Sequence, residues 1–158
     1  QIYGIRALIE ALKAGKTIDK VFLQKGLQGG LFRELMPLLQ AAQVPVQYVP
    51  VEKLNRLTKK NHQGVVANLS PVDYHNFEDL VISVTESGAT PLFLLLDHLS
   101  DVRNFGAIIR TAECAGVSGI IIPKRGSVSI TADTVKTSAG AVFRVPICKV
   151  ENLVDAVY

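Results

Sequence analysis

The stretch from Leu92 to Pro123 constrains the fold more than any other part of the sequence. It holds two short apolar runs, Leu92 to Leu96 and Gly119 to Ile122, separated by a segment whose apolar residues recur at helical spacing. Neither run alternates with polar residues, which is typical of strands buried on both faces of a parallel sheet. Strand, helix and strand in this order predict a βαβ unit with a right-handed crossover.

Polar residues follow the first predicted strand, where a ligand of a parallel sheet normally binds. We expect a loop from Asp97 to Arg103, an N-cap at Asn104 and a helix from Ala107, with Gly106 suited to a close backbone approach. Six residues of helix place Asn104 and Arg110 about 120° apart around the axis. The long Arg110 side chain can still reach back over the preceding turn, so the two polar groups can converge.

Two other interpretations of this segment are open. Asn104 can be only a cap, and Arg110 can pair with Glu113 on a solvated helix face. A dinucleotide-binding fold fits poorly, because the turn carries one glycine instead of three and the second strand runs into Pro123 and Lys124 rather than an acidic residue.

The segment LLDHLSDVRNFGAIIRTAECAGVSGIIIPK resembles the first conserved motif of the SpoU (TrmH-like) family of RNA ribose 2′-O-methyltransferases, within the SPOUT superfamily. The segments YGIRALIEALKAG and NHQGVVA resemble the substrate-binding domain that many members carry in front. The resemblance covers essentially the whole chain and is nearest to the branch that methylates rRNA guanosine. It implies S-adenosylmethionine as cofactor, a homodimer, and catalytic roles for Asn104 and Arg110.

The resemblance also implies an α/β fold with two domains. We expect a small αβα substrate-binding domain like ribosomal protein L30e at residues 1–70, a linker at 71–90, and the first part of a Rossmann-like, trefoil-knotted methyltransferase domain at 91–158. Two later family motifs, Gly-x-Glu-x-x-Gly and Ile-Pro-Met leading to Ser-Leu-Asn, do not occur in the sequence. We therefore expect a fragment, a processed N-terminus at Gln1, and a cofactor pocket that lies mainly beyond Tyr158.

Positive charge is concentrated in the first part of the chain. Residues 1–70 hold ten Lys and Arg against four Asp and Glu, whereas residues 71–158 hold seven against ten. A basic module favours a polyanionic partner such as RNA, although solubility alone can explain the charge. The candidate RNA-binding residues are Lys53, Arg56, Lys59, Lys60 and His62, with Lys124 and Arg125 at the end of the second predicted strand.

Each of these assignments has a plainer alternative. The basic cluster can be a solvated helix face, and His62 can stack on an unpaired base or serve as a cap or a solvent-exposed side chain. The turn from Ser138 to Ala141 is mainly structural by this reasoning, with RNA or cofactor contact as the second possibility.

The remaining elements follow from local patterns. We expect helices at 5–12, 31–42 (kinked or restarted at Pro37), 51–57, 77–84, 131–138 and from 151 onward, and strands at 20–24, 44–49, 64–69 and 142–148. Both cysteines are expected in the core of a cytoplasmic protein, and neither a membrane span nor a metal-ligand spacing is visible.

The sequence therefore predicts an RNA methyltransferase that acts on a ribose 2′-hydroxyl. Because an arginine side chain stays protonated, we expect Arg110 to stabilise developing negative charge rather than to act as a base. Three alternatives stay open: a tRNA substrate instead of rRNA, an RNA-binding protein without catalysis, and a small-molecule nucleotide enzyme.

Overall fold

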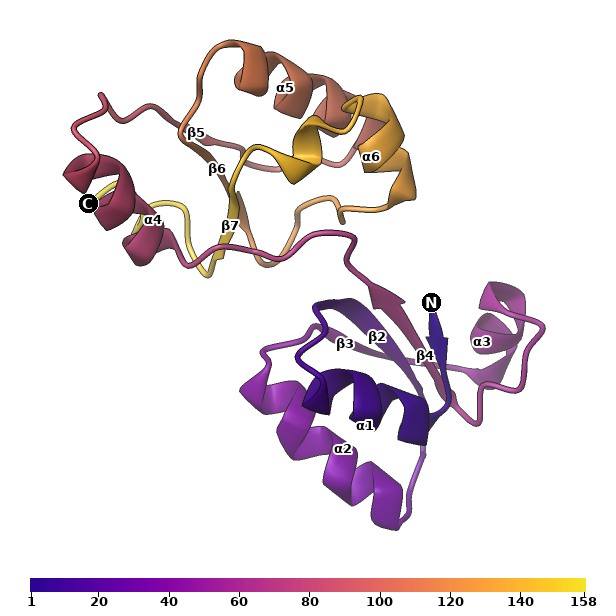
Figure 1. The fold of residues 1–158 in the computed structure, drawn as a ribbon. Coiled ribbons are helices and arrows are strands. Elements are labelled where there is room, and N and C mark those ends of the chain that lie inside the picture. Colours follow the sequence, from indigo (N-terminus) through magenta and orange to yellow (C-terminus); the bar gives the residue numbers. More distant parts are fainter. The chain divides into compact units, whose positions relative to one another are not determined.

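The computed structural model describes residues 1–158, and the chain divides between Ser70 and Pro71 into two units that each build their own sheet (Figure 1). The first unit contains β1 (Ile2–Tyr3), α1 (Ile5–Lys13), β2 (Ile18–Gln24), α2 (Gly30–Ala41), β3 (Val46–Val49), α3 (Val51–Leu57) and β4 (Val65–Leu69). The second contains α4 (Phe77–Glu86), β5 (Phe93–Leu95), α5 (Val102–Cys114), β6 (Gly119–Pro123), α6 (Ala132–Thr137), a 3₁₀ turn (Ala141–Phe143) and β7 (Ile147–Val150).

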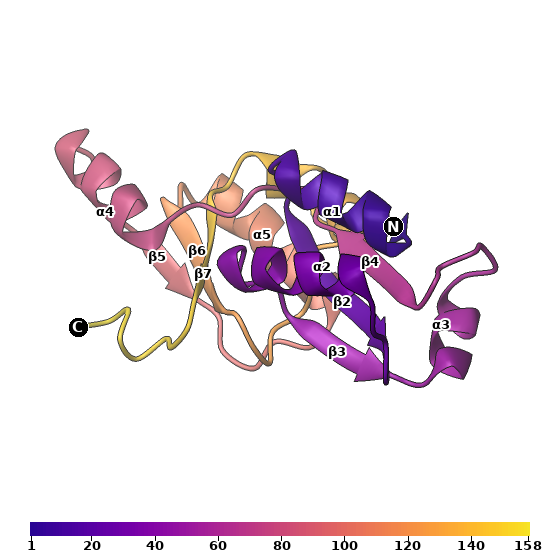
Figure 2. The same ribbon diagram turned by 90° about the horizontal axis from the view of Figure 1, so that it is seen from below.

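The sheet of the first unit has the strand order β1-β4-β2-β3. Strands β2 and β3 are parallel, and β4 runs antiparallel to both β1 and β2. Helices α1 and α2 lie side by side on one face, and their fully buried leucines, Leu8 and Leu35, pack against Val21 and Leu23 of β2 (Figure 2). A separate small core under α3 fills part of the other face.

Helix α2 continues through Pro37 as one helix, so the restart that we considered there is wrong. Pro37 is exposed, so the backbone carbonyl that loses its helical partner lies on the solvent side of the helix. Burial of Leu35 and Leu39 on the opposite side holds both halves of α2 on the same core.

The sheet of the second unit has three parallel strands in the order β5-β6-β7, which confirms the expected parallel βαβ unit. The central strand β6 is buried on both faces, with Ile120, Ile121 and Ile122 at 0% exposure. Strand β5 is at the edge, and Leu95 is 36% exposed there. Burial on both faces, which we expected for both strands, is thus found for β6, whereas β5 is only partly buried within residues 1–158.

A close contact joins α5 to α6. A Cβ atom added at Gly106 would lie 1.9 Å from Thr137 Oγ1 and 2.9 Å from the backbone carbon of Thr137. The expectation that Gly106 permits a close backbone approach is thus confirmed. Thr131 begins α6 with a capping box, as its position before the helix indicated.

Residues 71–90, which we expected to be a linker with a possible packed helix at 77–84, contain that helix, α4, within the second unit. His75 forms an isolated parallel bridge with Cys148, and the ring of Phe77 in α4 meets that of Phe93 edge-on at 6.4 Å. The prolines and acidic residues that suggested a joint surround an amphipathic helix capped by Asn76, whose side chain accepts a hydrogen bond from the Asp79 backbone N–H.

Three further expectations need correction. The strand expected from Val142 begins only at Ile147, because residues 141–143 form a 3₁₀ turn. Residues 151–158 form turns rather than the beginning of the helix that we expected there, and their apolar side chains Val154 and Val157 are at least 60% exposed. Cys148 is buried as expected, but Cys114 lies exposed on the outer side of α5.

Candidate functional site

Helix α5 begins at the carboxyl edge of the parallel sheet, and Asp101 is its N-cap. The Asp101 carboxylate accepts hydrogen bonds from the backbone N–H groups of Arg103 (2.7 Å) and Asn104 (3.0 Å). The Asn104 hydrogen bond, followed by the Arg103 hydrogen bond, lowers the pKa of Asp101 below its ordinary value. Asn104 is therefore not the cap that we expected but an exposed residue in the first helical turn.

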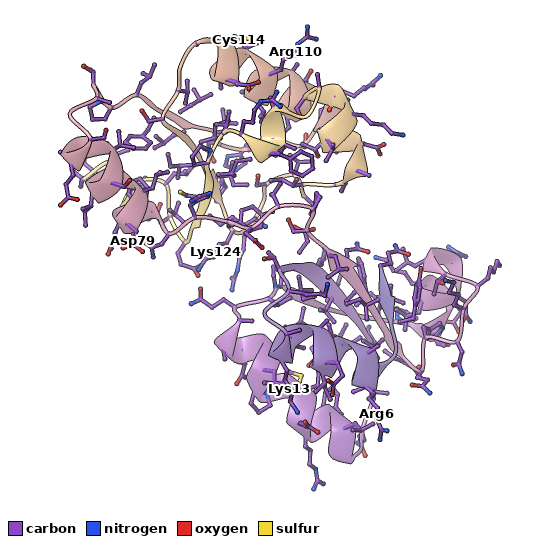
Figure 3. All side chains as sticks on the ribbon, in the orientation of Figure 1. Arg6, Lys13, Asp79, Arg110, Cys114 and Lys124 are labelled. Atoms are coloured by element: carbon purple, nitrogen blue, oxygen red, sulfur yellow. The ribbon has the colours of Figure 1, made fainter.

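Backbone and side-chain contacts hold the neighbouring loops at this edge. The Val128 N–H donates to the Leu99 carbonyl at 2.9 Å, which joins the loop after β6 to the loop after β5. Lys124, at the end of β6, forms an ion pair with Glu151 after β7 at 2.8 Å, and this pairing lowers the pKa of Glu151 (Figure 3). Arg125 is exposed beside it.

Arg110 is exposed on α5 and makes no hydrogen bond or ion pair (Figure 3). Its six-residue separation from Asn104 corresponds to about 9 Å along the axis and about 120° around it. The structure records no contact between the two side chains, so their expected convergence is not formed within this chain. The alternative pairing of Arg110 with Glu113 is also wrong, because Glu113 binds Arg144 through two hydrogen bonds.

Sequence reasoning passed over a second polar pair at this edge. His98 Nδ1 lies 2.8 Å from the Asp97 carboxylate, and both side chains are exposed. The backbone of His98 has φ 50°, a left-handed conformation that is uncommon for a residue other than glycine. The adjacent Asp and His directly after a strand were the signal that could have identified this pair.

The basic residues of the first unit gather near α3. Lys53 and Arg56 lie on α3, and Lys59 and Lys60 follow it, all of them exposed and none in an ion pair. The Lys53 ammonium lies 5.8 Å from the centre of the Phe22 ring, and the Lys60 ammonium lies 5.2 Å from that of Tyr3. This cluster is therefore accessible, unlike Lys124, which already binds a carboxylate.

His62 is buried, so the expectation of a solvent-exposed side chain is wrong, and its hydrogen bonds give it a structural role. Its Nδ1 accepts the Gly64 backbone N–H at 3.0 Å, which leaves Nε2–H to donate to Asn55 Oδ1 at 2.8 Å. The ring thus fixes the loop between α3 and β4.

The small-residue turn before β7 is also structural in this chain. Ser138 is fully buried, and its hydroxyl accepts the Val142 backbone N–H at 3.3 Å. Ala139 and Gly140 both adopt left-handed backbone conformations, with φ 51° and 78°. Their small size lets the chain reverse directly beside α5.

Two open hollows were found in the surface. One of about 500 Å³ is lined by Pro50, Glu52, Lys53, Arg56 and Leu57. The other, of about 440 Å³, includes Asp73, His75 and Phe143 in the second unit. Neither is lined by Asn104 or Arg110. No group of three or more His, Cys, Asp or Glu side chains is placed to hold a metal ion, and no helix is both long and apolar enough to span a bilayer.

Two known protein families match most of the chain. Residues 1–75 match the family model described as RNA 2′-O ribose methyltransferase substrate binding, and residues 91–158 match that of the SpoU rRNA methylase family.

Several individual proteins are similar to the chain. A Bacillus subtilis protein, YacO, named as a TrmH family tRNA/rRNA methyltransferase, is 36% identical over 152 residues, which are 96% of this chain and 61% of that protein. A Staphylococcus saprophyticus protein with the same family name is 37% identical over 99% of this chain and 63% of its own length. A solved rRNA methyltransferase from Sinorhizobium meliloti, bound to AdoMet, is 25% identical, with coverage of 99% of this chain and 56% of that one and a TM-score of 0.44.

Proposed function

This chain belongs to the SpoU family of RNA methyltransferases, and from that premise we propose that the protein containing it methylates a ribose 2′-hydroxyl of RNA. The chain spans little more than three-fifths of the length of the curated relatives that it matches, so the activity is proposed for the whole protein. The observation that carries the proposal is the segment Asn-Phe-Gly-Ala-Ile-Ile-Arg at the start of α5, next to the carboxyl edge of a parallel sheet.

S-adenosylmethionine is the proposed cofactor and supplies the methyl group. Neither hollow described above is lined by Asn104 or Arg110, so no residue of this chain is assigned as a cofactor contact. What the chain contributes is the handling of the ribose and its phosphates.

Asn104 and Arg110 are the proposed catalytic residues. The exposed amide of Asn104 can accept a hydrogen bond from the 2′-hydroxyl and orient it for in-line attack on the methyl carbon. Arg110 has no partner in the chain and keeps its five donors available. A guanidinium cannot accept the hydroxyl proton, so the proton passes to water while Arg110 stabilises the developing alkoxide or binds the adjacent phosphate.

We propose a cytoplasmic homodimer in which Arg110 serves the active site of the other subunit. The spacing of Asn104 and Arg110 on different sides of α5 supports this arrangement, since both side chains are exposed and do not meet within one chain. Light scattering of the full-length protein in solution tests the oligomeric state, and a monomer that retains full activity would contradict the shared site.

The proposed substrate is rRNA, at a guanosine, and the proposed RNA-binding residues of the first unit are Lys53, Arg56, Lys59 and Lys60. The matching family is named for rRNA, and the Bacillus subtilis relative is named for both tRNA and rRNA, so a tRNA substrate is the second candidate. Incubation of the full-length protein with labelled S-adenosylmethionine and each RNA separates them, and nucleoside analysis of the product identifies the methylated position.

Variants of α5 test the catalytic assignment. In the full-length protein, Arg110→Ala should reduce single-turnover methyl transfer by roughly 10²–10³, the usual cost of losing one preorganised charge donor. Arg103→Ala is the matched control, because Arg103 is also exposed on α5 and precedes Asn104. Equal rates for the Arg110 and Arg103 variants would remove Arg110 from the mechanism, and no methylation of any RNA by the unaltered protein would favour a noncatalytic RNA-binding role.

A further inference from the structure

We propose that the first unit grips RNA phosphates on the sheet face opposite α1 and α2, through three lysines seated over aromatic rings: Lys20, Lys53 and Lys60, here called the ring lysines. The proposal rests on the RNA methyltransferase function above and says where the substrate-binding unit touches its substrate. It adds Lys20, a strand residue outside the basic cluster that the sequence indicated, and places no contact on His62.

Strand register puts the two rings on one face. Val21 and Leu23 point toward α1 and α2, so Phe22 between them points to the opposite face. Val66 of β4 pairs with Phe22 of β2 on one side and with Tyr3 of β1 on the other. Directly opposed residues share a face, so Tyr3 and Phe22 lie two strand spacings apart, or about 10 Å.

Each ring holds lysine ammonium groups at short range. Lys20 and Lys53 lie 5.3 Å and 5.8 Å from the centre of the Phe22 ring, and Lys60 lies 5.2 Å from the centre of the Tyr3 ring. An ammonium within about 6 Å of a ring is attracted by the π face. The rings thus restrict three long, flexible side chains before RNA arrives, which reduces the entropy lost on binding.

The ring lysines have no acidic partners. None of the three takes part in an ion pair, whereas Lys13 on the α1 face is neutralised by Glu34 at 2.7 Å. The exposed charge around α3 and the loop after it adds Arg56 and Lys59, against the single acid Glu52. Charge complementarity therefore favours a polyanion on this face.

The binding mode follows from the burial of the Phe22 ring. Phe22 is only 9% exposed, and a base cannot stack on it without displacing two lysines. The contact is therefore with phosphate, which carries charge but no sequence information. We expect this surface to bind RNA of different sequences with similar affinity and with a strong dependence on salt.

The test measures affinity of the 158-residue chain for a single-stranded RNA oligonucleotide over a range of salt concentrations. Replacing the ring lysines together, as Lys20→Gln, Lys53→Gln and Lys60→Gln, should flatten the slope of log affinity against log salt by up to about 2, at about 0.7 per phosphate contact. Replacing the same three with arginine keeps charge and ring contact and should preserve the slope. Circular dichroism confirms that each variant is folded.

The matched control removes three cations elsewhere in the same unit, as Arg6→Gln, Lys16→Gln and Arg33→Gln. Arg6 lies on α1 (Figure 3), Lys16 in the turn after it and Arg33 on α2, and none is ion-paired. A slope that flattens much less than in the ring-lysine variant supports the proposal. Equal flattening in both variants would mean diffuse attraction and overturn it.

Two other outcomes separate this inference from the function on which it rests. If the unaltered chain binds RNA and the ring-lysine variant keeps the full salt slope, the surface is wrong but the proposed RNA substrate stands. If the unaltered chain binds no RNA at low salt, the substrate-binding role of the first unit fails as well. A loss that differs between two oligonucleotide sequences would show base contact and overturn the phosphate mode.

Discussion

Replacing Gly106 with alanine tests the contact between α5 and α6. The added Cβ atom would lie 1.9 Å from Thr137 Oγ1, 2.6 Å from its Cβ and 2.9 Å from its backbone carbon. Rotating the Thr137 side chain relieves only the first of these, so α6 itself must move.

The expected loss follows from two opposing effects. Overpacking typically destabilises a protein by 1–3 kcal/mol, and we expect about 3 kcal/mol here because the added Cβ meets a backbone atom. In a helix interior, alanine is more stable than glycine by about 1 kcal/mol because of its higher helix propensity. The net destabilisation of about 2 kcal/mol should lower the melting temperature of a unit this size by roughly 8–16 °C.

Thermal unfolding followed by circular dichroism or calorimetry measures this shift. Gly30→Ala is the matched control, because Gly30 begins α2 with no atom within 4 Å of the added Cβ and an ordinary backbone conformation. Adding Thr137→Ala to the Gly106 variant removes the nearest atom and should recover part of the loss. A Gly106→Ala protein as stable as the unaltered chain would refute the close packing of α5 on α6.

Two further predictions concern side chains with structural roles. His62→Ala should destabilise the first unit by about 1–3 kcal/mol, because the buried Gly64 N–H loses its hydrogen-bond acceptor. Urea unfolding measures this loss, and an unchanged unfolding midpoint would contradict it. The Arg144 hydrogen bond lowers the pKa of Glu113 below its ordinary 4.5, so the stability from this pair is present above pH 4.5 and is lost as pH falls through the lowered pKa. The difference in melting temperature between the unaltered chain and Glu113→Gln should therefore shrink as the pH falls below 4.5, and a constant difference would show that the pair is not coupled to folding.

Sequence patterns located the regular elements well where local chemistry decides them. Helix α3 has the predicted bounds, and the capped start of α6 was visible in Thr131. The position of a strand within its sheet could not be predicted from the sequence. The residues from Leu92 to Leu96 have the pattern of a buried strand, yet β5 pairs with only one strand in this chain. Strand order depends on contacts between distant segments, which no local pattern contains.

The candidate site was predictable in its residue types but less so in their roles. His62 lies in a basic run, and only its partners Asn55 and Gly64 show that it is a structural residue. Asn104 and Asp101 are both good N-cap residues, and the structure assigns the cap to Asp101 because its carboxylate reaches two backbone N–H groups. Neither outcome could be decided without the three-dimensional arrangement.

The hydrogen bond between Val128 N–H and the Leu99 carbonyl holds two loops together at the carboxyl edge without using any side chain. The start of α5 is held by this backbone contact and by the Asp101 cap, neither of which uses the side chains of His98 or Arg103. The Arg103 side chain can therefore be replaced without loosening this edge, whereas position 98 favours residues that tolerate φ 50°.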